Sequence, residues 1–562
     1  MGAPTSLYYN IYVAESVTRS ARSYISHSVM FFESFLANNV KFNSVNEIMT
    51  FIYNIIHEKD NRQFDDSVIL DRNIYPEEVF ARIMNIIDPL VWIPTEKQMS
   101  IVWDRILHLS QEDLNRVFYK NNLIEFCDLS KIKKAIIEIL CTLDEPFMNP
   151  NKPPENIIDK LDALLALVKE YVYYKYPFID KLDRIEYMMR DVVCISDTDS
   201  TIISFDGLYR FILDFVYNIP MKIKQREYKI TNLIKTNEDG VKEKRQIYTL
   251  VKPEYDYNFY TDEIIEIHKL RKINTLIPQE SLKYAIINIF GYICSDLIVD
   301  YLDYYCKLAN SNKPGRPCLL NMKTEFYFES LMITESRKNY ADIQTMQEGK
   351  IIPKTQKAQL DIKGLPINKS TLSAQIKQQF QDILYEDILM TPRIDQVKII
   401  KKLVMIEKEI VDSILRKETK YYKPGNVAAI GAYKDPMSQN GIKACLVYNE
   451  LRTGDMPIIN INERNSIYKV KVNITKENIH TIREEFPEVY AKLVKLYNHP
   501  ILGGSKLNTI GFPIDTPVPD WIMHFVDIKS IVNDNLSNFP LGPIGIQRLD
   551  NDSVNYTNNI SF

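Results

Sequence analysis

Two carboxylates spaced one residue apart, Asp197 and Asp199, are the side chains in this sequence best suited to chemistry. They lie in a short polar segment between two apolar runs rich in β-branched residues, 192–195 and 201–205. This pattern predicts a strand, a tight acidic turn and a second strand, with both carboxylates at the tip of the hairpin. Such hard oxygen ligands suit Mg²⁺, which binds one or two carboxylates together with substrate phosphates. Two such ions can hold the attacking and leaving oxygens of a phosphoryl displacement.

The acidic segment admits other interpretations. An Asx turn with a purely structural role has the same composition. Residues 195–201 also fit the pattern hydrophobic-x-Asp-x-Asp-x-Thr of haloacid-dehalogenase-type phosphatases, in which Asp197 would be the nucleophile and Asp199 the general acid. That fold needs alternating βα units, whereas here an apolar strand follows the motif directly. A third alternative is a non-catalytic DNA-binding replication scaffold that retains the carboxylates without using them.

Composition places the chain among soluble globular proteins. At 562 residues, with 45% hydrophobic and 25% charged residues, it is long enough for two to four domains. The net charge of −4 provides no overall attraction for nucleic acid, so DNA would have to be bound by local basic strips. The seven cysteines form no Cys-x-x-Cys pair, which argues against a zinc site and for a reducing compartment. We expect no signal peptide, no membrane-spanning run and no membrane partner.

The run Asp197-Thr198-Asp199-Ser200 resembles motif C of family B DNA polymerases, whose usual form is Tyr-Gly-Asp-Thr-Asp-Ser between two strands of the palm. Ile195 and Ser196 stand where Tyr and Gly are usual, so the departures precede the acidic pair. The resemblance implies that Asp199 is the principal catalytic metal ligand and Asp197 a supporting carboxylate. It also implies two Mg²⁺ ions as cofactors.

The segment 6–40 is predicted to be a loop followed by a long helix with an apolar stripe. Within it, Val17-Thr18-Arg19-Ser20-Ala21-Arg22 resembles the Val-Thr-x-x-Gly-Arg segment that follows motif B in the same family. Thr18 and Arg22 match, and Ala21 replaces the glycine. The resemblance implies a helix that returns from the fingers to the palm.

A second group of matches lies downstream. Lys338 and Tyr340 follow a predicted strand, 326–333, and resemble the Lys-x-Tyr motif that touches DNA at the primer terminus. Lys363 and Gly364 resemble the Lys-Gly segment between palm and thumb. The predicted DNA-binding residues would contact phosphates and sugars of DNA of any sequence. They are Arg337, Lys338, Tyr340, Lys363, Gly364 and Lys369. Together with Lys350, Lys354 and Lys357 they would form a basic strip.

Motifs A and B, which precede motif C in the family, are not found before it in this sequence. Ser6-Leu7-Tyr8 imitates the end of motif A, but Ala3 stands where its catalytic Asp belongs. Lys283, Asn288 and Gly291 loosely imitate motif B, but they follow motif C, so we predict that 283–299 is a buried helix. The chain is therefore expected to be the C-terminal half of a split polymerase of bacteriophage type. A partner chain would carry motifs A and B and possibly a 3′–5′ exonuclease.

The predicted fold is α+β, a family B palm with an antiparallel catalytic hairpin, a large helical insertion and a mainly helical thumb. The predicted divisions are 1–40 for the end of the fingers and the returning helix, 41–185 for the helical insertion, 186–355 for the palm, 356–550 for the thumb and 551–562 for a flexible tail. In the thumb, helices are predicted within 373–389, 392–417 and 476–496, and a strand ends the segment 431–449.

The resemblance implies a DNA-directed DNA polymerase that is inactive without its partner. The 3′-hydroxyl of a primer on template DNA would attack the α-phosphate of a deoxynucleoside triphosphate (dNTP) and release pyrophosphate, at two Mg²⁺ ions shared with the partner chain. A sliding clamp is a further possible partner, through Ile560-Ser561-Phe562. We expect the protein in the host cytoplasm or in a viral replication compartment.

Overall fold

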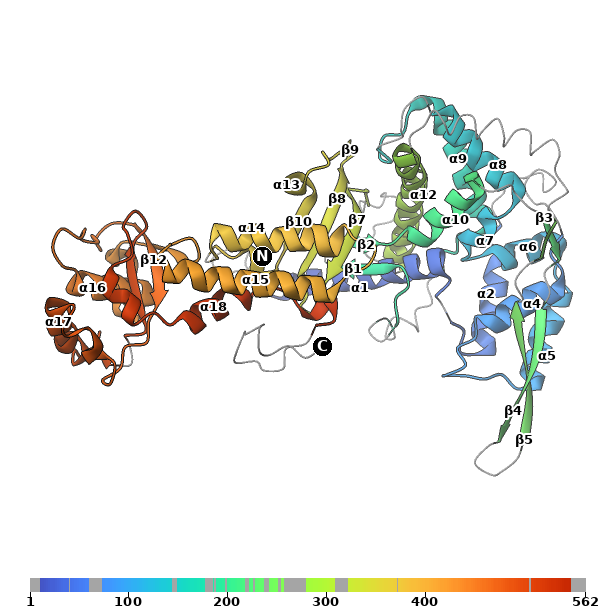
Figure 1. Ribbon diagram of the computed structural model, residues 1–562. Coiled ribbons are helices and arrows are strands. Elements are labelled where there is room, and N and C mark those ends of the chain that lie inside the picture. Colours follow the sequence, from blue (N-terminus) through green and yellow to red (C-terminus); the bar gives the residue numbers. More distant parts are fainter. Residues whose placement is uncertain are drawn as a thin grey trace. The chain divides into compact units, whose positions relative to one another are not determined.

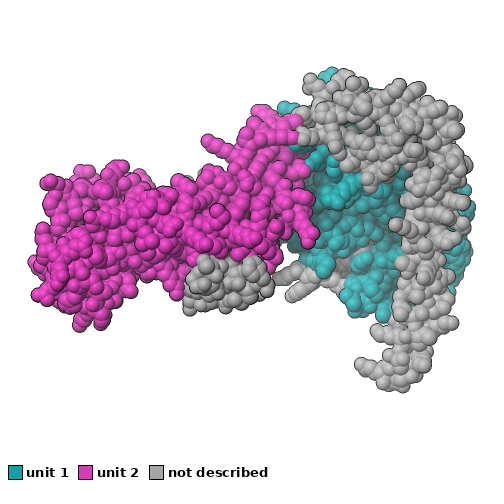
Figure 2. Space-filling model, in the orientation of Figure 1, with its two compact units in different colours: residues 1–325 teal, residues 326–562 magenta. Residues whose placement is uncertain are grey.

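The computed structural model describes most of the chain, in which two compact units are distinguished, 1–325 (unit 1) and 326–562 (unit 2) (Figure 2). Each unit has its own hydrophobic core. Helices and small antiparallel sheets occur in both, which confirms the predicted α+β class. The residues described are 11–39, 41–59, 73–143, 149–176, 185, 188–197, 200–217, 222–225, 228–236, 242–250, 254–256, 279–308, 322–370, 372–504 and 507–546.

Unit 1 is built mainly of helices (Figure 1). Polar caps begin several of them; for example, the Ser44 hydroxyl accepts the amide of Glu47 at the start of α2. The helices of unit 1 are α1 (Ile11–Ala37), α2 (Val45–His57), α4 (Pro76–Asn85), α5 (Glu96–Leu107), α6 (Gln111–Tyr119), α7 (Leu123–Cys127), α8 (Ser130–Thr142), α9 (Glu155–Tyr171), α10 (Asp206–Tyr217) and α12 (Gln279–Leu308).

The two longest helices, α1 and α12, contact each other in the core of unit 1. Their contact includes polar side chains, because Ser23 and Tyr305 share a hydrogen bond of 2.5 Å between their hydroxyls. The ring of His27 stacks at a tilt on Tyr305, and burial lowers the pKa of His27 to about 4. The predicted buried helix 283–299 is confirmed as part of α12.

The expectation that no apolar run reaches membrane-spanning length is wrong for α12. Within it, Lys283–Lys307 is long and apolar enough to cross a membrane, with a mean hydropathy of 1.5 over its most apolar window. However, 67% of that window is buried inside the unit. A helix surrounded by protein needs no polar face, so burial in the core accounts for its composition.

The described residues of unit 1 also form three small antiparallel sheets. The first pairs β1 (Val193–Ser196) with β2 (Thr201–Ile203), the predicted acidic hairpin. The second pairs β4 (Tyr228–Thr236) with β5 (Lys242–Leu250). The third pairs β3 (Lys222–Gln225) with β6 (Glu254–Asp256).

Unit 2 begins with a four-stranded antiparallel sheet in the order β10-β8-β7, with β9 on the far end of β8. These strands are β7 (Phe326–Ile333), β8 (Tyr340–Gln347), β9 (Lys350–Ile351) and β10 (Leu360–Lys363). β7 confirms the strand predicted from its aromatic and β-branched composition. One face of the sheet, with Ala341, Ile343 and Ile362, packs into the core of unit 2.

The rest of unit 2 is mainly helical, with a second antiparallel sheet of order β11-β12-β13. The predicted helices 373–389 and 392–417 are confirmed, the first as α14 continued by a π-helical turn. The elements are α13 (Gln356–Gln359), α14 (Ala374–Asp382), η3 (Ile383–Leu389), α15 (Gln396–Leu415), β11 (Lys423–Val427), α16 (Asn440–Leu451), β12 (Asn465–Lys471), α17 (Pro487–Tyr497), β13 (Thr509–Pro513) and α18 (Ile528–Leu536), with short 3₁₀ turns between them.

Two predictions in this region need correction. The strand predicted at the end of 431–449 is wrong, because these residues form α16, whose apolar side chains pack against β13. A run of apolar residues in this segment fits a buried helix as well as a strand, and the tertiary contact decides between them. The single helix predicted over 476–496 is divided, since Pro487 begins α17 and a 3₁₀ turn, Ile479–Ile482, precedes it.

The predicted palm range, 186–355, includes residues of both units, because the two units divide after residue 325.

Candidate functional site

The acidic hairpin is short and irregular. Ser196 of β1 pairs with Thr201 of β2, and the amide of Asp197 donates to the carbonyl of Ser200 over 2.8 Å, which closes the turn. The register shifts between Val193 and Ile195, so a bulge bends the strand shortly before the turn. Asp197 is half-buried at the end of β1. Thr198 and Asp199 lie outside the described residues, so the predicted principal ligand has no structural account here.

The strand that leads to Asp197 is attached to α1 by a buried carboxylate. Glu33 of α1 is fully buried and accepts hydrogen bonds from the backbone amides of Asp191, Val192 and Val193. Burial alone would raise the pKa of Glu33, but the hydrogen bonds from Asn39 and from these amides outweigh it and hold the pKa below its ordinary value. Thr18 and Arg22, the matched residues of the predicted returning helix, lie exposed on the same helix.

The hairpin offers oxygen donors of the kind that Mg²⁺ prefers. Among the described residues, no group of three or more His, Cys, Asp or Glu side chains could hold a metal ion by itself. Asp197 carries one carboxylate, and Asp199, which the sequence predicts as the other ligand, follows two residues further along the sequence. This donor set fits an ion that takes one or two protein carboxylates and completes its shell with phosphates and water.

In unit 2, the Lys-x-Tyr segment forms a tight turn between β7 and β8. The amide of Thr334 donates to the carbonyl of Asn339 over 3.1 Å, and Lys338 has a left-handed backbone with φ of 62°. Arg337 and Lys338 are exposed in this turn, and Tyr340 is half-buried as the first residue of β8. The turn therefore presents basic side chains at one end of the sheet.

The Lys-Gly segment lies directly beside this turn. Lys363, at the end of β10, is the register partner of Tyr340, and its ammonium nitrogen lies 5.7 Å from the centre of the Tyr340 ring. Burial alone would lower the pKa of Lys363, but Tyr340 and the carboxylate of Asp361 raise it above its ordinary value. Lys363 therefore remains charged beside the aromatic ring.

Gly364 holds the two segments together. Its φ is 68°, and a Cβ added there would lie 2.0 Å from Oδ1 of Asn339 and 2.6 Å from the carbonyl oxygen of Lys338. Only glycine allows so close an approach. The structure thus brings together four predicted DNA-binding residues, Lys338, Tyr340, Lys363 and Gly364.

The remaining basic residues of the predicted strip are distributed more widely. Lys350 lies on β9, which pairs with the opposite end of β8. Lys354 and Lys357 are exposed between β9 and β10. Lys369 is exposed after β10, and its ammonium nitrogen lies 3.5 Å from Oδ1 of Asn538. Lys350 thus lies at the end of β8 away from the turn, so the predicted strip is not one continuous row along the sheet.

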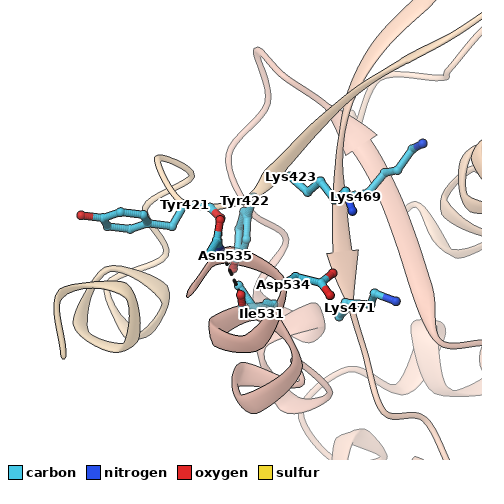
Figure 3. Close-up of a pocket in the computed structure, with 8 residues that line it drawn as sticks. All are labelled: Tyr421, Tyr422, Lys423, Lys469, Lys471, Ile531, Asp534 and Asn535. Atoms are coloured by element: carbon cyan, nitrogen blue, oxygen red, sulfur yellow. Dashed lines mark hydrogen bonds between the residues drawn. The ribbon is translucent and has the colours of Figure 1, made fainter. Parts of the chain in front are cut away.

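Three further lysines, which sequence reasoning missed, line a small hollow in unit 2 (Figure 3). Lys423 of β11 and Lys469 of β12 are direct cross-strand partners, and Lys471 lies two residues further along β12. Like charges placed opposite each other on a sheet are destabilising. Asp534 and Asn535 of α18 line the same hollow, so the lysines outnumber the one carboxylate.

Several of these residues left a signal in the sequence. Glu33 falls within the apolar stripe of α1, between Phe32 and Phe35, where a charged side chain is unexpected without partners. Lys469 and Lys471 alternate with apolar residues at strand spacing. Their partners, at 191–193 and on β11, lie far away in sequence, so only the folded chain identifies them.

The comparison with protein families agrees with the motifs of unit 2. A model of the family described as divergent family B DNA polymerase matches residues 265–553, which is just over half of the chain. The match includes the Lys-x-Tyr turn, the Lys-Gly segment and the three-lysine hollow, whereas α1 and the acidic hairpin precede it. No curated protein matches the sequence. The chain therefore belongs to the divergent family B DNA polymerases, of which residues 265–553 form the C-terminal region.

Proposed function

We propose that this chain is the palm-and-thumb part of a DNA-directed DNA polymerase that extends a primer with dNTPs. The observation that carries the proposal is the pairing of Tyr340 with Lys363, fixed by Gly364 against the Lys338 turn, within the family match. Lysines beside a tyrosine suit a sugar-phosphate backbone of any sequence, because the charge attracts phosphate and the ring packs against the sugar.

For the chemical step, we propose that Asp197 and Asp199 hold Mg²⁺ at the tip of the hairpin. When bound, Mg²⁺ would neutralise charge that develops on the transferred phosphoryl group. The hairpin would orient the carboxylates, and the Lys338 turn would fix the primer strand. The observation in support is the two-stranded hairpin itself, which ends at Asp197 in a closed turn.

We further propose that motifs A and B are supplied by a second chain. The 562 residues contain Ser-Leu-Tyr without the preceding catalytic Asp of motif A. A partner carrying Asp-x-x-Ser-Leu-Tyr would complete the metal site. We also propose that the complex works in the host cytoplasm or in a viral replication compartment, where its template would lie.

The phosphatase alternative finds no support in the sheets. All strand pairs of the sheets formed by the described residues are antiparallel, including β1 with β2, whereas a haloacid-dehalogenase fold needs a parallel sheet. The non-catalytic scaffold predicts the same DNA contacts without chemistry. It is the alternative that the experiment must separate from the polymerase.

The test is primer extension with Mg²⁺ by the tagged chain, purified together with whatever binds it in its native source. Wild-type complex should extend the primer, and Asp199→Ala should reduce extension by at least ~10³-fold, since it removes the principal ligand. Asp197→Ala should cause a smaller loss. Both variants should bind primer-template DNA as the wild type does.

Four outcomes are decisive. Extension that needs Asp199 and a second polypeptide supports the whole proposal. Extension by the pure chain alone contradicts the partner. DNA binding with no extension by any preparation, or extension that is unchanged by Asp199→Ala, contradicts the assigned active site and favours the scaffold.

A further inference from the structure

We infer that Glu33 is a positioning residue that holds the strand entering the acidic turn, and thereby Asp197, in the geometry that metal binding requires. The inference rests on the proposed function, because Glu33 acts through the hairpin and does not touch substrate. The hairpin motif itself contains no sign of this role, since Glu33 lies 164 residues before Asp197 in the sequence.

The contacts of Glu33 are specific. Its Oε1 accepts the amides of Val192 over 3.0 Å and Val193 over 2.7 Å. Its Oε2 accepts the amide of Asp191 over 3.0 Å and the side-chain amide of Asn39 over 2.8 Å. A carboxylate has about four lone-pair sites, so four donors satisfy it fully. Glu33 is therefore a hydrogen-bond anchor and has no free oxygen for a metal ion.

The end of α1 is arranged around this carboxylate. The backbone amide of Asn39 donates to the carbonyl of Glu33 over 2.9 Å, after Asn38 takes a left-handed conformation. The same side-chain nitrogen of Asn39 also donates to the carbonyl of Met189 over 2.7 Å. Asn39 thus orients the Glu33 carboxylate and also forms its own hydrogen bond to the segment just before β1.

The hairpin needs such an anchor for a physical reason. β1 and β2 have four and three residues, and β1 contains a bulge, whereas an isolated two-stranded hairpin is at best marginally stable in water. The carboxylate anchors residues 191–193, and Asp197 follows Val193 by four residues, about 13 Å of extended strand. Loss of the anchor would free the strand at its base and displace the turn.

Glu33 should remain ionised wherever the polymerase works. Its pKa is below the ordinary value of 4.5, because Asn39 and the three amides outweigh the effect of burial. The anchor would therefore not vary with pH near neutrality, which separates Glu33 from a general base. A change in the pH profile is not expected when Glu33 is replaced.

The test uses Glu33→Gln in the polymerase complex. Glutamine keeps the size of the side chain but replaces one acceptor oxygen with a donor, which would face amide donors. We expect kcat to fall ~10- to 100-fold, because small displacements of reacting groups have effects of this size. The Mg²⁺ concentration for half-maximal rate should rise, whereas the Kd for primer-template DNA should stay within about twofold.

A second readout does not depend on activity. Hydrogen–deuterium exchange of the full chain should increase in peptides that cover 191–204 and stay unchanged in α12. Asn39→Ala is a milder variant that removes the two side-chain hydrogen bonds of Asn39, and it should show the same pattern to a smaller extent. It keeps the inference testable if Glu33→Gln fails to fold.

Glu170→Gln is the matched control. Glu170 is a buried glutamate of the same unit, and it pairs with Arg116 between α9 and α6, away from β1. The Glu170→Gln variant should have a lower stability, but its Mg²⁺ requirement and its hydrogen–deuterium exchange at 191–204 should equal those of the wild type.

Unchanged exchange and kcat in Glu33→Gln, with Asp199→Ala inactive, would overturn the role of Glu33 alone. Extension unaffected by Asp199→Ala would instead overturn the proposed active site.

Discussion

Asp342 is fully buried on β8, directly opposite Asp361 of β10. Burial and then the negative charge of Asp361 raise the pKa of Asp342 to about 7, although Lys363 and Gln344 act in the opposite direction. Two carboxylates on neighbouring strands cannot both be ionised at low cost. With a pKa of about 7, Asp342 is protonated in about half of the molecules at neutral pH, which reduces the repulsion between the two carboxylates beside Lys363.

This arrangement predicts a pH-dependent stability. The pKa of Asp342 is about 7 in the folded protein, whereas an aspartate in an unfolded chain has the ordinary value of 3.8. Between these two pH values, the folded state therefore keeps a proton that the unfolded state has lost. The stabilisation from this proton is fully present below pH 3.8 and is lost as the pH rises through 7. In the Asp342→Asn variant this side chain cannot ionise. Between pH 5 and pH 8, the free energy of unfolding of the wild type should therefore fall by about 2 to 3 kcal/mol relative to that of the variant, at about 1.4 kcal/mol per pH unit.

Urea unfolding at several pH values would measure this difference. Asp361→Asn is the informative control, because it removes the neighbouring charge and should reduce the pH dependence without abolishing it. Parallel stability profiles for wild type and Asp342→Asn would show that Asp342 is ionised in the folded protein.

At the scale of elements, β11 and β12 bring three lysines close together, although like charges on neighbouring strands repel each other. Lys423 and Lys469 face each other across the strands, and Gly425 leaves room for the Lys469 side chain, whose Cε would lie 2.8 Å from an added Cβ. The like charges cost stability. A phosphate of bound DNA would offset that cost, so we interpret the hollow of Figure 3 as part of the DNA-binding surface.

The interpretation predicts opposite effects on stability and binding. Replacing Lys423, Lys469 and Lys471 together by glutamine should leave the melting temperature unchanged or higher, because repulsion is removed. The same change should weaken primer-template binding and reduce its salt dependence, by about one unit of slope for each phosphate that a lysine no longer neutralises.

Replacing Lys408, Lys476 and Lys495 by glutamine changes the net charge equally and is the matched control. These three lysines belong to unit 2 and lie outside the hollow. Equal losses of affinity for both triple variants, measured by fluorescence anisotropy over a range of salt, would refute a specific role of the hollow.

At the scale of the whole molecule, the described residues form two hydrophobic cores, one in each unit. The buried cluster of unit 1 extends from Val29 to Leu302, and that of unit 2 from Met332 to Ile546. A unit that buries its own apolar residues can fold without the rest of the chain. The family match, 265–553, includes every residue of the second cluster.

We therefore expect a chain of residues 326–562 to fold on its own, with cooperative unfolding and a stability of about 5 to 15 kcal/mol. Circular dichroism during urea unfolding would measure it. A shorter chain, 326–480, should not fold, because it lacks the part of the core contributed by β13 and α18. Failure of the longer chain to unfold cooperatively would show that unit 2 depends on unit 1.

The sequence by itself determined the local features whose causes are local. Two runs rich in β-branched residues, on either side of Asp197 and Asp199, predicted the hairpin, and aromatic and β-branched residues predicted β7. Apolar residues at helical spacing within 6–40 predicted a long helix, which is α1. The resemblance to family B was carried by two short motifs, the acidic pair and the Lys-x-Tyr run, whose residues lie close together in the sequence. In contrast, the segment 431–449 depends on contact with β13, and its predicted strand was wrong.

Only the tertiary structure decided which distant residues act together. Glu33 meets 191–193, Lys363 meets Tyr340, Asp342 meets Asp361, and Lys423 meets Lys469. None of these pairs is separated by a fixed number of residues that a pattern could reveal. They result from strand register and from the burial of apolar faces, which place polar groups beside partners that satisfy or perturb them. The carboxylates of the acidic turn could be identified from the sequence, whereas the hydrogen bonds to Glu33 that hold the strand before it could be identified only in the folded chain.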